Sequence, residues 1–231
     1  MTRFVMVAGA RLGAWAWDEV VSELGRRGYE AYPLSLSGLA EKQGIPAGQQ
    51  THVRDIVDEV ERLDLREVVL VGHSYSGIPI GQAAQRIGDR LARVVFVDSN
   101  VPVDGESFLD SFPSDHIRKA LAENGGYWPT SGPADYADQD LTDQQISRMV
   151  TDGTPHPGAT LTEPAVLAHP LADLPATYVK CLLDGEELPV PVDELVASGR
   201  WELVRMDTGH WPMFSRPREL ARILVESATR S

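Results

Sequence analysis

The sequence has 231 residues, a length that accommodates one large domain or two small ones. Hydrophobic residues make up 42% of it and charged residues 24%, which is typical of globular proteins and excludes disordered, collagen-like and coiled-coil chains. The 21 Lys and Arg residues against 34 Asp and Glu residues give a net charge of −13. Because binding to nucleic acids and anionic membranes depends on basic side chains, this charge argues against both as partners.

The cysteine content and the hydropathy pattern bear on the compartment. Cys181 is the single cysteine, so neither an internal disulfide nor a thiolate metal site with a second cysteine can form. The apolar run at residues 4–7 is too short for a signal peptide, and no stretch approaches the roughly 20 apolar residues of a membrane span. We therefore expect a soluble, cytoplasmic protein, and a homodimer is compatible with the sequence.

Short runs of apolar, often β-branched residues alternate with segments of helical periodicity. The expected strands are residues 4–7, 29–34, 68–71, 94–97, 178–183 and 202–206. They show little polar alternation, which is typical of parallel strands covered on both faces. Between the second and third runs, apolar residues recur at helical spacing at Val53, Ile56, Val57, Val60 and Leu63. The pattern predicts an α/β fold with a doubly wound, mostly parallel six-stranded sheet.

The alternation breaks down between residues 102 and 169. Two amphipathic segments stand out there, residues 114–122 and 142–150, and the second begins with a plausible capping box at Thr142. We expect residues 102–169 to form a small helical insertion over one edge of the sheet. Residues 1–101 and 170–231 would then form the core.

The third expected strand runs directly into a serine that is flanked by small residues. Residues 68–77 read Val-Val-Leu-Val-Gly-His-Ser-Tyr-Ser-Gly and are followed by an apolar helical segment, which is the strand, turn and helix context of a nucleophile elbow. Ser76 stands where the strict pattern has glycine, but it is small enough to be tolerated. Ser74 is therefore the candidate nucleophile.

A serine hydroxyl needs a base, and histidine has the appropriate pKa near neutral pH. We choose His210, because it follows the last expected strand and would lie at the carboxyl edge of the sheet. His73 adjoins Ser74 but should point away from it, and His52 should lie solvated on a helix. We expect surface or hydrogen-bonded packing roles for the remaining three, which are His116, His156 and His169.

The base in turn needs a carboxylate to fix its tautomer. Asp184 follows the fifth expected strand, and the order Ser74, Asp184, His210 is the order that this architecture uses. Asp98, which follows the preceding strand, is the main alternative. The other nearby carboxylates are Glu186, Glu187 and Asp207.

An acyl-transfer site also needs hydrogen-bond donors for the oxyanion. The backbone N–H of Tyr75, directly after the nucleophile, is one candidate, and that of Ala10, in the loop after the first strand, is the other. In that loop Arg11 would face solvent or a substrate carboxylate.

The motifs together resemble an α/β-hydrolase, specifically the small-molecule esterase branch that contains plant methyl-ester hydrolases and hydroxynitrile lyases. The matching stretches are residues 4–10 with Trp15 and Trp17, 72–75, 97–102, 178–184 and 209–210. The resemblance implies a sheet that lacks the first two strands of the full fold, with a helical cap inserted after the fourth strand present. It also implies a triad of Ser74, Asp184 and His210, with oxyanion donors at Ala10 and Tyr75.

Two departures from the family pattern bear on the reaction. The first stretch usually begins with His-Gly, whereas this chain has Ala8 and Gly9. Hydroxynitrile lyases of this type place a lysine directly after the catalytic histidine and a threonine in the first loop. This chain has Trp211 after His210 and no hydroxyl at Gly9 or Ala10, so cyanogenic cleavage is disfavoured.

The expected function is that of a serine hydrolase, which cleaves a small, fairly apolar carboxylic ester or a lactone through an acyl-enzyme and needs no cofactor or metal. Five aromatic residues are candidates for the walls of the substrate site: Trp15, Phe108, Tyr127, Trp128 and Trp211. Two alternatives remain. One is a cofactor-free lyase, decarboxylase, cyclase or dioxygenase that uses the His/Asp pair, and the other is a ligand receptor without catalysis.

Overall fold

A computed structural model describes residues 2–229, apart from the side chains of Asp184 and Val190. All six expected strands form, and they lie parallel in one sheet of order β2-β1-β3-β4-β7-β8. Their bounds are β1 (Arg3–Val7), β2 (Glu30–Leu34), β3 (Val68–His73), β4 (Leu91–Val97), β7 (Ala176–Cys181) and β8 (Trp201–Met206). The predicted α/β fold class is confirmed.

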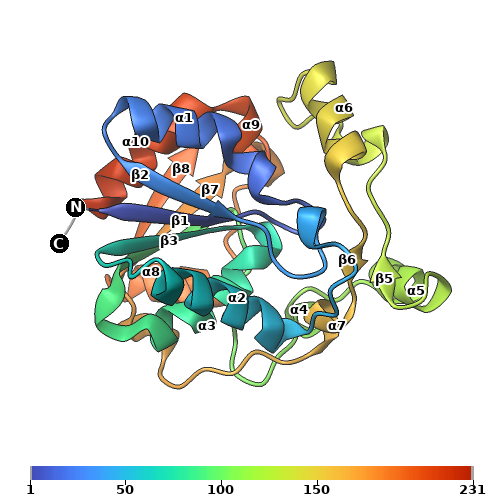
Figure 1. Cartoon of the computed structure of the whole chain (residues 1–231), viewed down its shortest axis with the longest axis horizontal. Coiled ribbons are helices and arrows are strands. Elements are labelled where there is room, and N and C mark those ends of the chain that lie inside the picture. The colour runs from blue at the N-terminus through green and yellow to red at the C-terminus, as the bar shows by residue number, and fades with distance from the viewer. Residues whose placement is uncertain (1, 230–231) are drawn as a thin grey trace.

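Helices cover both faces of the sheet (Figure 1). One face is covered by α1 (Asp18–Arg26), α9 (Pro212–Ser215) and α10 (Pro217–Ala228), and the other by α2 (Gln49–Arg62), α3 (Gly77–Ile87) and α8 (Val190–Ala197). On α2 the periodic residues Val53, Ile56 and Val60 are buried in the core, as their spacing predicts. Two hydrophobic cores result, one on each side of the sheet.

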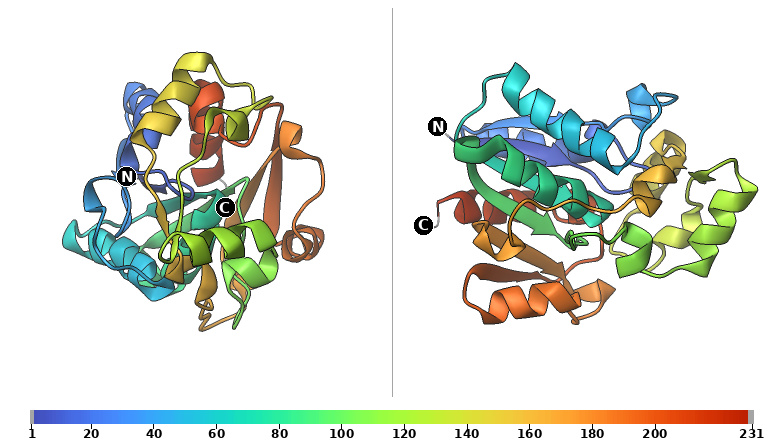
Figure 2. Two further views of the ribbon diagram at one scale, coloured as in Figure 1. Left: turned by 90° about the vertical axis from the view of Figure 1, so that its right-hand side faces the viewer. Right: turned by 90° about the horizontal axis from the view of Figure 1, so that it is seen from below.

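Residues 102–169 leave the sheet between β4 and β7 and add no strand to it. They contain α4 (Phe108–Ser111), α5 (Asp115–Glu123), α6 (Asp143–Asp152), α7 (Ala159–Thr162) and an antiparallel pair of two-residue strands, β5 (Tyr127–Trp128) and β6 (His156–Pro157). The capping box predicted at Thr142 is present, since its side chain accepts from Gln145 N–H at the start of α6. Figure 2 shows this segment, called the insertion below, beyond the carboxyl ends of the strands.

Short 3-10 turns complete the chain: η1 (Ala14–Trp17), η2 (Ala40–Lys42), η3 (Ser74–Ser76), η4 (Gly88–Arg90), η5 (Pro133–Tyr136), η6 (Leu171–Asp173) and η7 (Leu182–Asp184). Two of them, η3 and η7, directly follow the carboxyl ends of β3 and β7. The strand order reverses direction at β1 and β3, and open α/β sheets bind ligands at such a point. The fold therefore favours a site between the carboxyl edge and the insertion.

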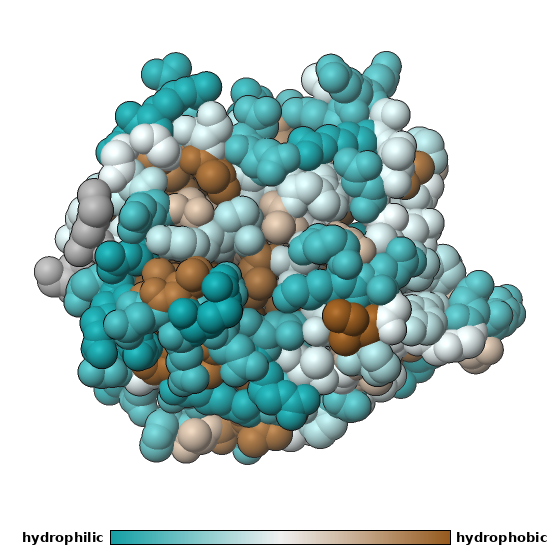
Figure 3. All heavy atoms as spheres, viewed as in Figure 1, coloured by the Kyte–Doolittle hydropathy of each residue, from teal (hydrophilic) through white to brown (hydrophobic). Residues whose placement is uncertain are grey.

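The surface seen in Figure 3 is mostly hydrophilic, with small and separate hydrophobic patches. None of the helices within residues 2–229 combines the length and the apolar character needed to cross a membrane.

Candidate active site

Ser74 lies at a sharp turn between β3 and α3. Its backbone φ of 54° is in the left-handed region, which residues other than glycine rarely adopt. A Cβ atom at Gly72 would come within 2.6 Å of the Ile80 side chain, so the position before the turn has no room for a larger residue. Ser76, on the other side, donates a buried hydrogen bond to the carbonyl of Ala8 at the end of β1. The residue that departs from the strict motif thus ties the serine turn to the neighbouring loop.

The imidazole of His210 is hydrogen-bonded to Asp98. The distance between His210 Nδ1 and Asp98 Oδ2 is 2.7 Å, and the Asp98 side chain is only 2% exposed. A carboxylate accepts but does not donate, so Nδ1 carries the hydrogen and Nε2 is left with its lone pair. This tautomer is the one that a general base requires.

The second carboxylate oxygen of Asp98 is also occupied. Its Oδ1 accepts from Lys180 Nζ at 3.0 Å and from the backbone N–H of Cys181 at 3.1 Å, both on β7. The ion pair is buried, with side-chain exposures of 7% for Lys180 and 2% for Asp98. Asp98 also has a positive φ of 43°, so its backbone, like that of Ser74, is held in an uncommon conformation. These contacts hold the carboxylate in a fixed orientation toward His210.

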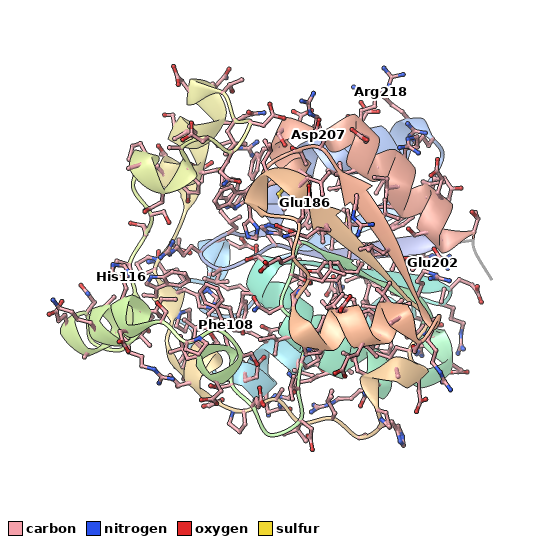
Figure 4. The ribbon with its side chains drawn as sticks, turned by 180° about the vertical axis from the view of Figure 1, so that it is seen from behind. Phe108, His116, Glu186, Glu202, Asp207 and Arg218 are labelled. Carbon is pink, nitrogen blue, oxygen red and sulfur yellow. The ribbon has the colours of Figure 1, made fainter. Side chains whose placement is uncertain are left out.

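The contact expected from Asp184 is thus made, within the described side chains, by the alternative carboxylate Asp98. Asp184 ends the η7 turn after β7, on the strand next to β4, and its side chain lies outside the described part of the structure. Its assignment as the triad acid remains a prediction. The other candidates Glu186, Glu187 and Asp207 are exposed, and Figure 4 shows Glu186 and Asp207 in the loops beyond their strands. Of these three, Glu187 lines the cavity that Ser74 and His210 also line.

The loop that carries His210 is held by residues far away in the sequence. Gln139 Oε1 in the insertion accepts from the backbone N–H of His210 at 2.6 Å. His73 Nε2 donates to the backbone carbonyl of His210 at 2.7 Å. A Cβ atom at Gly209 would lie 2.3 Å from the Gln139 carbonyl oxygen, so only glycine allows this approach. Both backbone groups of His210 are therefore fixed.

A cavity of about 460 Å³ opens beside Ser74 and His210. Its lining includes three of the expected aromatic residues, Phe108, Trp128 and Trp211. Among the described residues that line it, Lys180 is the one lysine, and it is paired with Asp98. Figure 4 shows Phe108 on α4, between the sheet and the outlying helix that carries His116.

The other two expected aromatic residues, Trp15 and Tyr127, lie away from this cavity. Trp15 packs against Phe214, with ring centroids 5.9 Å apart, and Tyr127 lines a separate hollow with Pro129 and Pro155. Neither is among the described residues that line the cavity with Ser74. Trp15 lies in η1 on the α9 side of the sheet, and Tyr127 points to the opposite side of its strand from Trp128, because successive side chains in a strand alternate.

The expected oxyanion donors flank the serine turn. Tyr75 directly follows Ser74 in η3, and Ala10 lies in the loop after β1, where its N–H donates to no protein acceptor within residues 2–229. A Cβ atom at Gly9 would lie 2.8 Å from the Cβ atom of Ser74, so this glycine lets the loop approach the nucleophile. The two amides are proposed donors on this geometry.

The expectation for His52 was wrong, because this histidine is fully buried rather than solvated. It lies one helical turn before Ile56 and so shares the buried face of α2. Its Nε2 donates to the Ser37 carbonyl and its Nδ1 accepts from the Tyr75 hydroxyl, both at 2.9 Å. Burial lowers the pKa of His52 from 6.5 to about 4, so the ring is neutral near pH 7.

This burial predicts a pH-dependent stability. Between pH 6.5 and 4 the unfolded chain protonates His52 and the folded chain does not. The free energy of unfolding therefore has its full value above pH 6.5 and decreases on acidification, by about 3 kcal/mol at pH 4. We expect His52→Gln to remove this part of the pH dependence. Urea unfolding at pH 7, 5.5 and 4.5 measures it, with exposed His116→Gln as the control. Equal pH slopes in the wild type and His52→Gln would contradict the prediction.

Two residues of the site, Lys180 and Gln139, were missed in the sequence, and only Lys180 left a signal. Lys180 lies within a buried strand, two residues after the buried Tyr178, so both side chains are on the same buried face of the sheet. A charged residue at such a position indicates a buried partner of opposite charge. Gln139 lies in a loop of the insertion and has no local pattern that would point to His210. Within residues 2–229, no group of three or more His, Cys, Asp or Glu side chains could hold a metal ion.

Comparisons with known proteins bear on the family and the fold of the chain. The sequence profile of the Alpha/beta hydrolase family matches residues 4–223. The chain is similar to a carbendazim hydrolyzing esterase of Nocardioides sp. (strain SG-4G), with 27% identity over 97% of this chain and 99% of that protein. It is also similar to Methylesterase 9 of Arabidopsis thaliana, with 26% identity over 99% and 98% of the two chains.

Among solved structures, the fold is similar to that of an extracellular alpha/beta-hydrolase from a Paenibacillus species, which shares structural and functional homology with tobacco salicylic acid binding protein 2. The TM-score is 0.87 at 22% identity, and 100% of each chain is covered. At this identity the likeness shows the fold.

Proposed function

The chain belongs to the alpha/beta hydrolase family and is an ester hydrolase, and we propose that it cleaves small, apolar carboxylic esters through an acyl-enzyme on Ser74. The observation that carries the proposal is the hydrogen bond of 2.7 Å between Asp98 and His210 Nδ1, in a cavity that Ser74 also lines. That bond puts the ring hydrogen on Nδ1, so that Nε2 carries the lone pair that a general base needs.

The reaction then follows from the roles of these groups. His210 Nε2 takes the proton of the Ser74 hydroxyl as its oxygen attacks the ester carbonyl, and Asp98 stabilises the imidazolium that forms. The backbone N–H groups of Ala10 and Tyr75 donate to the developing oxyanion. His210 returns the proton to the leaving alcohol, and a water molecule activated by the same imidazole hydrolyses the acyl-enzyme.

The cavity supports the choice of substrate. Its volume of about 460 Å³ is within the range of small-molecule sites, and its walls carry Phe108, Phe112, Trp128 and Trp211. Three of these four come from the insertion, so we propose that residues 102–169 act as a cap that shapes the pocket. Aromatic walls favour an apolar acyl or alcohol group, and a small lactone would fit the same chemistry.

A fluorophosphonate probe tests the proposal directly, because it phosphonylates a serine that a neighbouring base activates. We expect one label per chain, located by mass spectrometry on the peptide that contains Ser74. Preincubation with a slowly hydrolysed apolar ester should slow the labelling. A protein that neither takes the label nor hydrolyses p-nitrophenyl acetate and butyrate would contradict the proposed function.

A further inference from the structure

A histidine of the insertion contacts both segments that carry the proposed oxyanion donors. His156, in β6, is fully buried, and its Nδ1 accepts from the backbone N–H of Arg11 at 3.2 Å. Arg11 directly follows Ala10. The His156 ring also packs edge-on against the ring of Tyr75, with centroids 4.7 Å apart.

The partners of His156 fix its tautomer. Its Nε2 lies 2.8 Å from the Thr160 hydroxyl, and that hydroxyl donates to the Pro157 carbonyl at 2.6 Å, so Nε2–H is the donor to Thr160. Nδ1 consequently carries the lone pair that Arg11 N–H requires. Burial lowers the pKa of His156 well below its ordinary value, which keeps this neutral form at neutral pH.

Arg11 needs such an external support. Its φ of 70° is in the left-handed region, a conformation that is unfavourable for a residue with a side chain. Its carbonyl accepts from Thr154 N–H at 2.9 Å, so both of its backbone polar groups bond to residues 154–156 of the insertion. Strained conformations of this kind persist where surrounding contacts hold them.

The side chain of Arg11 is held by the insertion as well. Its guanidinium carbon lies 3.5 Å from the ring centroid of Trp128, which faces His156 across the β5 and β6 pair. It also donates to the Ser131 hydroxyl. Arg11 is thus only partly exposed, and its guanidinium group is held by Trp128 and Ser131 of the insertion.

We propose that His156 is a positioning residue for the oxyanion hole, which fixes the Ala10 amide by accepting from the N–H of the adjacent Arg11. The inference rests on the proposed esterase function. His156 is not itself a base for the reaction, because its two ring nitrogens are bonded to Arg11 and Thr160 and it is absent from the described lining of the cavity.

Two neutral variants of similar polarity separate this role from general packing. In His156→Asn the side-chain oxygen can take the place of Nδ1 and accept from Arg11 N–H. In His156→Gln the amide reaches the position of Nε2 and can donate to Thr160, but it leaves Arg11 without an acceptor. Both lose the imidazole ring, so a merely structural role would affect them alike.

We expect His156→Gln to lower kcat for an activated ester by about 10- to 100-fold with KM within about threefold, because displaced oxyanion donors affect mainly the transition state. His156→Asn should retain kcat within about fivefold of the wild type. Thermal unfolding of both variants ensures that rates are compared on folded protein. Equal kcat values in the two folded variants, or a loss that lies in KM, would overturn the inference.

Amide hydrogen exchange of the wild-type protein provides a second measurement that needs no variant. The Arg11 N–H should exchange slowly, and rapid exchange would overturn the proposed contact. The outcomes also separate the two proposals. An active wild type whose His156→Gln variant is equally active overturns the positioning role alone, whereas a wild type with neither ester turnover nor labelling at Ser74 overturns both.

Discussion

Replacing Ser74 by alanine is expected to lower kcat for an activated ester by about 10⁴- to 10⁶-fold, because removal of the nucleophile eliminates the acyl-enzyme. The half-buried serine lies on a turn whose positive φ is imposed by its neighbours, so alanine should keep the fold. Steady-state hydrolysis of p-nitrophenyl butyrate, with circular dichroism as the check on folding, measures the effect.

Ser99→Ala is a matched control for this variant. Ser99 lines the same cavity, and its hydroxyl makes no hydrogen bond within residues 2–229. We expect it to stay within about tenfold of the wild type. A Ser74→Ala protein that keeps most of its turnover while His210→Ala loses it would indicate proton abstraction by the His/Asp pair, as in a cofactor-free lyase. Tight ligand binding without turnover in the wild type would instead indicate a receptor.

Asp98→Asn is expected to lower kcat by about 10³- to 10⁴-fold. The asparagine oxygen would remain with its partners on β7, Lys180 Nζ and Cys181 N–H, and its NH₂ group would then face His210 Nδ1. Nδ1 must accept from that group, so the hydrogen moves to Nε2. In this tautomer the imidazole cannot take the proton of Ser74. Single-turnover kinetics at neutral pH measure the loss.

The same variant leaves Lys180 buried opposite a neutral amide, and an uncompensated buried charge costs about 3 to 5 kcal/mol of stability. The double variant Asp98→Asn/Lys180→Met removes both charges and should recover stability without recovering turnover. Asp184→Asn is the comparison for the other carboxylate. A loss of 10³-fold or more in Asp184→Asn together with an active Asp98→Asn would assign the orienting role to Asp184.

The strands and the sharp turn at Ser74 could be predicted because their signals are local. Runs of Val and Leu in buried parallel strands, and a serine between small residues after such a run, depend on a few consecutive positions. The six strands formed with bounds close to those expected, and Ser74 lies at the turn after β3. The capping box at Thr142 was predictable for the same reason.

The remaining contacts depend on distances across the fold, which the sequence does not encode locally. Asp98 and Asp184 both follow strands that end at one edge of the sheet, so order along the chain could not decide between them. His52 could have been placed better, because its spacing from Ile56 puts it on the apolar face of α2. The contact of His156 with Arg11 joins residues on opposite sides of the serine in the sequence, and no periodicity reveals it.

In the proposed mechanism the catalytic groups and the pocket walls come from different parts of the chain, which has an evolutionary consequence. Ser74 and Asp98 follow the central strands β3 and β4, whereas much of the aromatic wall comes from the insertion. Mutations in the insertion can therefore diversify substrate preference among descendants while the reaction is conserved. Residues 154–156 are an exception, because on the proposed role of His156 mutations there would lower the rate itself.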